Sequence, residues 1–246
     1  MKKVLKRTEL SGTMPVHLFG ESCEMNSIVE MCNNHNIAMV EDCAHAIGTR
    51  YSNRHVGTFG DAGCFSFYPT KNMTVGGSGG MIVTNSRQIN RFCRETLNYG
   101  RTEIGTIDRL GYNGTMPTIA GAIGRTQLKR LPEMLEKRKL LASEYNKRLK
   151  SSVHYGLPSD NNERTWNYYT VLCDDRQKTM DLMKENNIEY GIYYEKLCSE
   201  QIPFNSIRFK NDTPCSKYQT KHLLALPLHP NLTLKDIEFV CETIKY

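Results

Sequence analysis

The stretch that decides the fold is residues 37–84, where three short apolar runs read IAMVED (37–42), GDAGCFSF (60–67) and GGMIVT (79–84). Each run is bounded by glycines or polar turn residues, which is the pattern of a buried strand. A helical pattern at 24–34 precedes the first run. Because buried strands that alternate with helices are typical of α/β proteins, we expect an α/β fold.

Working outward, the rest of the chain predicts two domains, residues 1–148 and a smaller α+β domain at 149–246. Pro132 is expected to begin a new helix that runs to about Lys150, because proline lacks the amide hydrogen that the first turn of a helix does not need. The other expected elements are strands at 15–20, 168–173, 189–194 and 223–228, helices at 86–97, 117–130, 176–186 and from about Leu234, and a loop at 199–217.

Composition excludes several classes of protein. The 246 residues are 39% hydrophobic and 24% charged, which fits a globular chain and excludes disordered and collagen-like classes. No apolar run is long enough to span a bilayer, and the basic start of the chain lacks the apolar core of an export signal. Nine cysteines without a C-x-x-C pair predict reduced thiols in a cytoplasmic protein.

The formal charge of +6 raises the question of a nucleic-acid partner. Nine basic residues fall within 125–150, on a predicted helix where a solvated face is the simpler explanation. Trp166, Tyr168 and Tyr169 are expected to be core residues on a strand, and no RNA-binding signature surrounds them. We therefore expect neither nucleic acid nor membrane among the partners.

The residues that carry chemistry lie between 41 and 80. Asp42 ends one predicted strand, and Ser66 and Lys71 follow the next, at the strand ends where α/β folds place their sites. A buried lysine has a lowered pKa, and its neutral amine can form an imine with a carbonyl. This suits pyridoxal phosphate, whose ring nitrogen needs a carboxylate such as Asp42. Ser66 and the glycine-rich backbone of residues 76–80 are candidate phosphate donors.

A metal centre is the alternative reading of the same region. Cys43, His45, His55 and Cys64 carry thiolate and imidazole ligands that suit zinc. Their spacing fits no zinc-finger pattern, so we expect no metal.

Further motifs strengthen the reading of a cofactor enzyme. In chain order, they are PVHLFG (15–20), VEDCAHAIG (40–48), FSFYPTKN (65–72), GGMIVT (79–84), LGYN (110–113), AIG with QL (122–128) and LPLHP (226–230). With these motifs the sequence resembles the DegT/StrS family of pyridoxal-phosphate-dependent aminotransferases, which act on nucleotide-linked keto-sugars and have the fold type I (aspartate aminotransferase-like) architecture.

The resemblance implies a role for each site residue. Lys71 would hold the cofactor covalently and shuttle a proton, Asp42 would pair with the pyridine nitrogen, and His45 would lie beside the ring. Ser66 would hold the phosphate. Asn113 would reach the phosphate of the neighbouring subunit's cofactor, which implies a homodimer. The substrates implied are an amino donor, commonly glutamate, and a nucleotide-linked keto-sugar, used in turn.

The resemblance covers only the last two thirds or so of a typical member, so residues 1–148 are expected to be the C-terminal part of the cofactor domain. Ser11-Gly12-Thr13 is interpreted as a coincidental likeness to an upstream phosphate-binding segment. Thr115 replaces a usual arginine, and residues 193–198 replace a proline-rich stretch. Lys71 argues against the dehydratase branch, where histidine replaces it. The alternative is a truncated or split, non-catalytic relative that binds cofactor weakly or serves as a partner subunit.

Overall fold

The computed structural model describes residues 10–150, 152, 155–158, 163–204, 206 and 212–245. They form two compact units, which we describe separately. Unit 1 holds the described residues up to Leu135 together with Glu163–Asn167, and unit 2 holds the remainder. The change between units falls inside helix α4 (Thr118–Leu149), and the domain boundary predicted at 148/149 stays a prediction.

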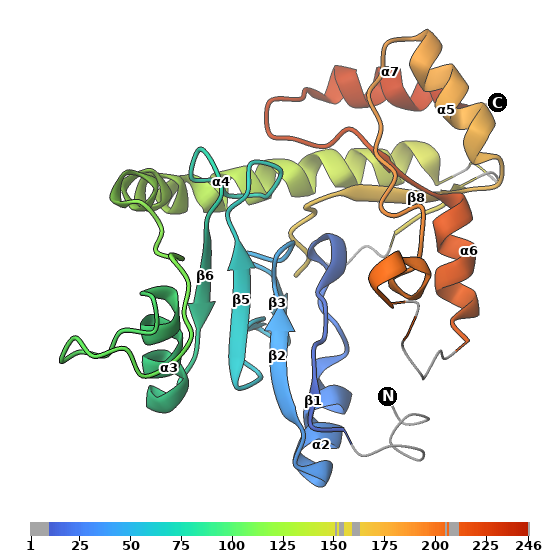
Figure 1. Cartoon of the computed structure of the whole chain (residues 1–246). Coiled ribbons are helices and arrows are strands. Elements are labelled where there is room, and N and C mark those ends of the chain that lie inside the picture. Colours follow the sequence, from blue (N-terminus) through green and yellow to red (C-terminus); the bar gives the residue numbers. More distant parts are fainter. Residues whose placement is uncertain are drawn as a thin grey trace. The chain divides into compact units, whose positions relative to one another are not determined.

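Unit 1 is built on a four-stranded sheet in the order β1 (Gly12–Thr13), β2 (Ala38–Asp42), β5 (Ala62–Ser66) and β6 (Gly80–Val83), as Figure 1 shows. β2 runs parallel to both β1 and β5, and β6 is antiparallel to β5. The three predicted strands of residues 37–84 are thus confirmed, and they are neighbours in one sheet.

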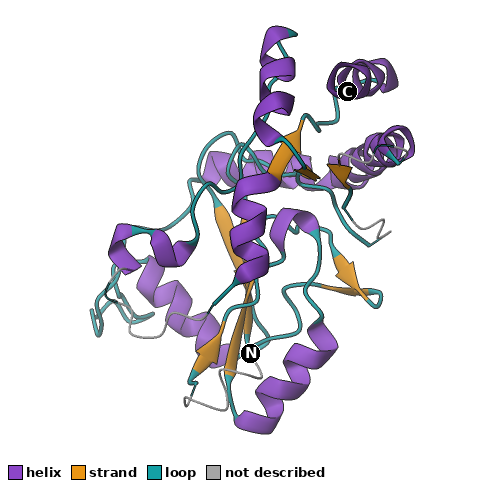
Figure 2. Ribbon diagram, turned by 90° about the vertical axis from the view of Figure 1, so that its right-hand side faces the viewer, coloured by secondary structure: helices purple, strands orange, loops and turns teal. Residues whose placement is uncertain are grey.

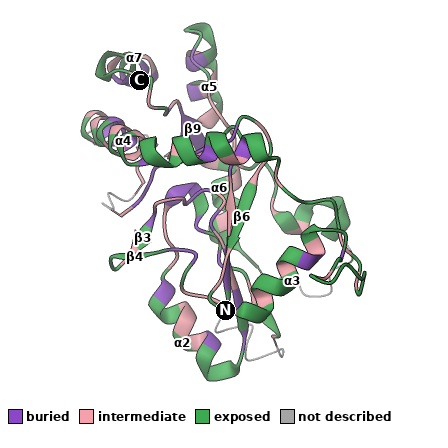
Figure 3. Cartoon of the chain, turned by 90° about the vertical axis from the view of Figure 1, so that its left-hand side faces the viewer, coloured by how far each residue is buried: buried purple, intermediate pink, exposed green. Residues whose placement is uncertain are grey.

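Helices α2 (Met25–His35) and α3 (Arg87–Leu97) lie on opposite sides of this sheet in Figures 2 and 3. Met25 and Cys32 of α2 are buried against Met39 of β2, which fixes one face of the sheet. The Ser86 side chain caps α3 by accepting a hydrogen bond from the Ile89 amide at 3.3 Å. Both helices were predicted and are confirmed.

The strand predicted at 15–20 is wrong in its second half. Val16 forms only an isolated parallel bridge with Asp42, and Leu18–Gly20 form the 3-10 turn η1. Phe19 and Gly20 have φ angles of +59° and +91°, which a strand cannot contain. Gly12–Thr13 instead supplies β1. The small hairpin of β3 (Arg50–Tyr51) and β4 (Arg54–His55) was not predicted.

The new helix predicted to begin at Pro132 is also wrong, because α4 is continuous and Pro132 lies in its interior. A proline inside a helix lacks the amide hydrogen that would bond to the carbonyl four residues earlier, here that of Leu128, and its ring crowds that carbonyl. Leu131 next to it is buried in the core of unit 1 with Phe67 and Met73, and this packing holds the helix through the proline.

Unit 2 has an antiparallel sheet in the order β7 (Tyr155–Gly156), β8 (Tyr169–Cys173) and β9 (Leu223–Leu226). Its helices besides the end of α4 are α5 (Arg176–Glu185), α6 (Pro214–His222) and α7 (Leu234–Ile244). Tyr145 of α4 stacks on Tyr169 with ring centroids 4.5 Å apart, and its hydroxyl donates to the Pro227 carbonyl at 2.9 Å. Helix α4 therefore contacts both the sheet, at Tyr169, and the LPLHP motif, at Pro227.

Three predictions for the second half need correction. The loop predicted at 199–217 contains the 3-10 turns η2 (Cys198–Glu200) and η3 (Ile202–Phe204) and the start of α6, where Pro214 occupies the first turn. Residues 205 and 207–211 of that range lie outside the described residues. The strand predicted at 189–194 is reduced to one bridge between Gly191 and Ala225. Trp166 is buried, as expected, but belongs to unit 1 and to no strand.

All nine cysteines are free thiols, as predicted. None of the described helices is both long enough and apolar enough to cross a bilayer.

Candidate active site

Asp42 and Ser66, two of the predicted site residues, lie where β2 and β5 end. Parallel strands bring their carboxyl ends to one edge of the sheet, and Asp42 of β2 pairs with Cys64 of β5 in register. Because side chains alternate along a strand, Asp42, Cys64 and Ser66 project from the same face. They line a hollow of about 250 Å³, whose other lining residues are Met14, Val40, Glu41, Ala44 and Phe65.

Asp42 is held from three directions. Its amide donates to the Pro15 carbonyl at 2.9 Å, and its own carbonyl accepts from the His17 amide at 3.0 Å. Its carboxylate oxygen Oδ1 accepts a hydrogen bond from the Ala44 amide at 2.9 Å. The negative group that faces the hollow therefore has a fixed direction.

Lys71 lies on the loop that leaves β5 and returns as β6. The loop is closed by hydrogen bonds from the Phe67 amide to the Gly79 carbonyl, 2.8 Å, and from the Lys71 amide to the Tyr68 carbonyl, 2.9 Å. Partial burial lowers the pKa of the Lys71 amine, and the negative charge of Asp42 partly opposes this change. Lys71 and Asp42 are thus close enough to interact, although Lys71 does not line the hollow.

His45 is buried beside the same residues. Its Nδ1 accepts a hydrogen bond from the Phe19 amide at 3.3 Å, and its ring stacks on the Phe19 ring with centroids 6.1 Å apart. Burial, together with the positive charge of Lys71, lowers the pKa of His45 to about 4, and Asp42 opposes the shift. His45 is therefore neutral, and because Nδ1 is an acceptor, its hydrogen sits on Nε2.

Ser66 ends β5 opposite Gly80 of β6. Its Oγ accepts a hydrogen bond from the Tyr68 amide at 3.3 Å, so the hydroxyl hydrogen can be donated elsewhere. Among the glycines predicted as phosphate donors, Gly79 closes the loop through its carbonyl and Gly80 pairs with Ser66 in the sheet. Gly77 lies in open space, because a Cβ added there would meet nothing within 4 Å.

Asn113 is not brought to this group within the chain. It is exposed, and it forms an isolated bridge with Asn98. Its predicted partner is the cofactor of a second subunit, so its role stays a prediction.

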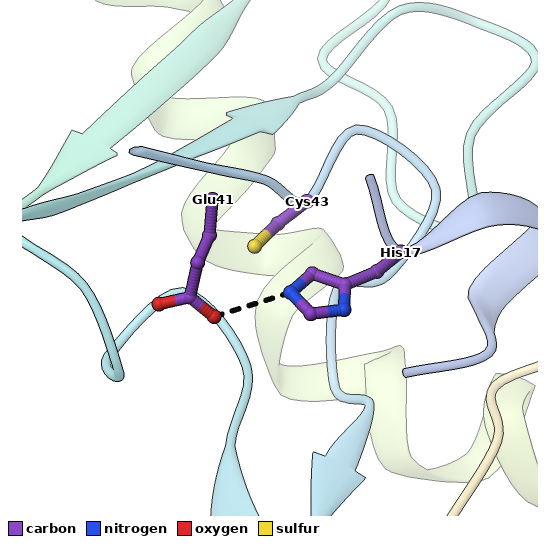
Figure 4. A group of neighbouring side chains, drawn as sticks. All are labelled: His17, Glu41 and Cys43. Carbon is purple, nitrogen blue, oxygen red and sulfur yellow. Dashed lines mark hydrogen bonds and ion pairs between the residues drawn. The ribbon is translucent and has the colours of Figure 1, made fainter. Parts of the chain in front are cut away.

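A buried cluster behind the hollow was missed by the sequence reasoning. Figure 4 shows His17, Glu41 and Cys43, whose potential ligand atoms lie within 4.8 Å of one another. Glu41 precedes Asp42 on β2 and so projects to the opposite face. The only sign of this cluster in the sequence was the pair of adjacent acids at the strand end. The fold brings His17, 24 residues away in sequence, to within 3.1 Å of the Glu41 carboxylate.

Hydrogen bonds account for the Glu41 carboxylate and the His17 ring in this cluster. Glu41 accepts from His17 and from the amides of Gly57, Phe59 and Gly60, at 2.6–3.1 Å. Burial alone raises the pKa of Glu41, but these four bonds outweigh it and leave the pKa below its ordinary value. The four bonds fill the four lone-pair positions of a carboxylate. His17 uses its other ring nitrogen to accept from the Cys23 amide at 3.1 Å, so the pair supports the strand end.

The zinc set considered from sequence is not assembled among the residues that the structure describes. His55 is exposed on the β3–β4 hairpin, whereas His45 is buried and directed at Phe19. Burial and the neighbouring Glu41 strongly raise the pKa of Cys43, which keeps its sulfur protonated. A larger cavity of about 530 Å³ beside α3 contains none of the predicted site residues.

Together these features define an α/β protein with a lysine, a carboxylate, a neutral histidine and a hydroxyl around the ends of two parallel strands. Comparison with protein families assigns it more closely: residues 1–245 match the DegT/DnrJ/EryC1/StrS aminotransferase family. The chain belongs to this family.

Three similar proteins show how far the likeness extends. The pleiotropic regulatory protein of Geobacillus stearothermophilus is 30% identical over 236 residues, covering 94% of this chain and 63% of that protein. GDP-perosamine synthase of Escherichia coli O157:H7 is 29% identical over 248 residues, covering 99% and 66%. The crystal structure of an aminotransferase of this family from Brucella abortus is 28% identical and superposes with a TM-score of 0.88, covering 94% and 62%.

The structural match confirms the expected fold type I architecture, present here as a partial sheet. The chain spans between 62% and 66% of the length of these three proteins.

Proposed function

We propose that this chain is a pyridoxal-phosphate-dependent aminotransferase that transfers an amino group, with glutamate as donor, to a nucleotide-linked keto-sugar. The observation that carries the proposal is that Asp42 and Ser66 line one hollow at the ends of β2 and β5, with Lys71 and His45 near enough to Asp42 for their charges to interact. The relative named GDP-perosamine synthase supports a nucleotide sugar as the acceptor. Cytoplasmic location is part of the same proposal.

The residues present fit this cofactor. A pyridine ring needs a fixed carboxylate, and the Asp42 carboxylate faces the hollow with its direction set by the Ala44 amide. A phosphate needs donors, and the Ser66 hydroxyl on the same face has a hydrogen to donate. We therefore assign Asp42 to the ring nitrogen, Ser66 to the phosphate and His45 to the ring substituent nearest its Nε2.

Lys71 and His45 have separate roles in the proposed reaction. The lowered pKa of Lys71 increases the share of neutral amine at neutral pH, and a neutral amine can both attack a carbonyl and accept a proton. The neutral imidazole of His45 would offer its Nε2 hydrogen to the bound cofactor without adding positive charge beside Lys71. When bound, the cofactor supplies the electron sink and carries the amino group between the two substrates.

Asn113 completes the site only if a second copy of the chain is present. The proposal therefore includes a homodimer. Exposed apolar side chains surround Asn113 in unit 1, among them Leu110 at 95% exposure and Tyr112 at 73%. Such side chains on a surface are typical of a region that another chain covers.

A non-catalytic role is the second candidate. It is favoured by one relative, 30% identical over 236 residues, that is itself named a regulatory protein. In that role the chain would bind cofactor weakly or complete a partner subunit.

One experiment separates the two functions. The purified chain is mixed with pyridoxal phosphate, its visible absorbance is recorded, and borohydride then fixes any lysine adduct for peptide mass spectrometry. We expect a new band and a label on Lys71, both lost in Lys71→Ala and both retained in Lys129→Ala, which removes an exposed lysine of α4. Labelling that is found on other lysines and is retained in Lys71→Ala would refute the catalytic assignment and favour the non-catalytic one.

A further inference from the structure

The segment Glu163–Asn167 returns to unit 1 although the chain on either side of it belongs to unit 2. Arg164, Thr165, Trp166 and Asn167 are all at most 5% exposed. We infer that this segment, which we call the strap, is a positioning element that holds Lys71 and His45 in place. The inference rests on the proposed function for the role of these two residues.

The strap holds the residue that directly follows Lys71. The Asn72 amide donates to Oδ1 of Asn167 at 3.2 Å, and Nδ2 of Asn72 donates to the Thr165 carbonyl at 3.0 Å. Asn72 is only 5% exposed, so these bonds are made away from water, where leaving a donor unpaired is costly. Both the backbone and the side chain next to Lys71 are therefore fixed by the strap.

The strap also holds the residue that orients His45. The Asn167 amide donates to the Phe19 carbonyl at 3.0 Å, and the Thr165 amide donates to the Gly20 carbonyl at 3.1 Å. The Phe19 amide in turn donates to Nδ1 of His45. A continuous series of bonds thus leads from the strap to the ring that we place beside the cofactor.

Backbone strain is concentrated at this contact. Phe19 and Trp166 have left-handed φ angles of +59° and +52°, which residues with side chains rarely adopt. A Cβ on Gly20 would lie 2.8 Å from Oγ1 of Thr165 and 3.0 Å from the Trp166 amide nitrogen, so the two segments approach as closely as glycine allows. Strained conformations persist where surrounding contacts enforce them, and they cluster at functional sites.

The far end of the strap offers a matched control. The Glu163 carboxylate accepts from the amides of Ser52 and Asn53, at 3.0 and 2.7 Å, in the turn between β3 and β4. None of these bonds reaches Asn72 or Phe19. Glu163→Ala should therefore remove the strap's side-chain bonds to the hairpin and keep its bonds to Asn72 and Phe19.

The test measures the titration of the Lys71 amine in the cofactor-free chain, by competitive acetylation at a series of pH values and peptide mass spectrometry. In the parent chain, Lys71 should titrate below the ordinary pKa of a lysine amine. Asn167→Leu keeps the branched shape of the side chain but removes the acceptor for the Asn72 amide, and Asn72→Ala removes the donor to Thr165. In both variants we expect the pKa of Lys71 to move toward the ordinary lysine value, while Glu163→Ala leaves it unchanged.

Urea unfolding of each variant tests whether the variant is folded under the conditions of the titration. An unchanged Lys71 titration in both folded variants, or an equal change in Glu163→Ala, would overturn the inference. With cofactor added, Lys71 labelling by borohydride should fall at least about tenfold in Asn167→Leu, equal to about 1.4 kcal/mol. Because the titration needs no cofactor, a parent chain that is never labelled would refute the proposed function as a separate result.

Discussion

At the scale of single residues, the site combines groups whose charges oppose one another. Asp42 favours a charged Lys71, whereas burial favours the neutral amine. The charges of both residues act on His45, which is kept neutral by burial and by Lys71. Glu41, directly beside Asp42 in sequence, is charged but fully satisfied on the other face of β2. One strand end therefore carries two carboxylates with different roles, one exposed to the hollow and one structural.

The burial of neutral His45 predicts a pH dependence of stability. Its folded pKa of about 4 lies below the ordinary 6.5, so the unfolded chain binds a proton in that interval that the folded chain does not. The free energy of unfolding should thus fall as the pH falls from about 6.5 to about 4, by roughly 2–3 kcal/mol from this group. Urea unfolding at several pH values measures the slope.

The slope over this interval should be much smaller in His45→Gln, which cannot titrate. His55→Gln removes an exposed histidine of the hairpin and should keep the parent slope. Equal slopes in the parent chain and His45→Gln would show that His45 binds its proton equally well in both states.

At the scale of elements, α4 shows how packing overrides a local signal. Pro132 is a strong start signal for a helix, yet α4 continues through it because Leu131 is anchored in the core of unit 1. Pro132 itself is exposed, so its replacement disturbs no packing.

Pro132→Ala should therefore stabilise the protein. Alanine restores an amide that can donate to the Leu128 carbonyl and removes the ring from the helix interior, for a gain of about 1–3 kcal/mol in the free energy of unfolding. Urea unfolding with far-ultraviolet circular dichroism measures both stability and helix content. Glu133→Ala, an exposed neighbour, should change the free energy by less than about 0.5 kcal/mol. A neutral or destabilising Pro132→Ala would indicate two helices that meet at Pro132.

At the scale of the whole molecule, the sequence predicted that Asp42 and Ser66 lie close together, but not the contacts that support them. Asp42 and Ser66 were predictable because both end apolar runs, and parallel strands bring such ends together. The pairing of His17 with Glu41 and the return of residues 163–167 to unit 1 depend on contacts between residues far apart in the chain. No periodicity or local motif encodes such contacts, and most of the strap's bonds involve backbone groups that every sequence shares.

The homodimer that we propose predicts complementation between two defective variants. In a mixed dimer of Lys71→Ala with Asn113→Ala, the site on the Lys71→Ala chain lacks both groups. The site on the other chain keeps Lys71 and receives Asn113 from its partner. Random exchange makes about half of the dimers mixed, and each has one intact site, so about a quarter of the parent's borohydride labelling at Lys71 should return.

Lys71→Ala alone should give none, and Asn113→Ala alone little. If exchange is confirmed by mass but labelling stays at the level of Asn113→Ala alone, Asn113 does not act across subunits. If Asn113→Ala is labelled like the parent chain, Asn113 has no part in holding the cofactor.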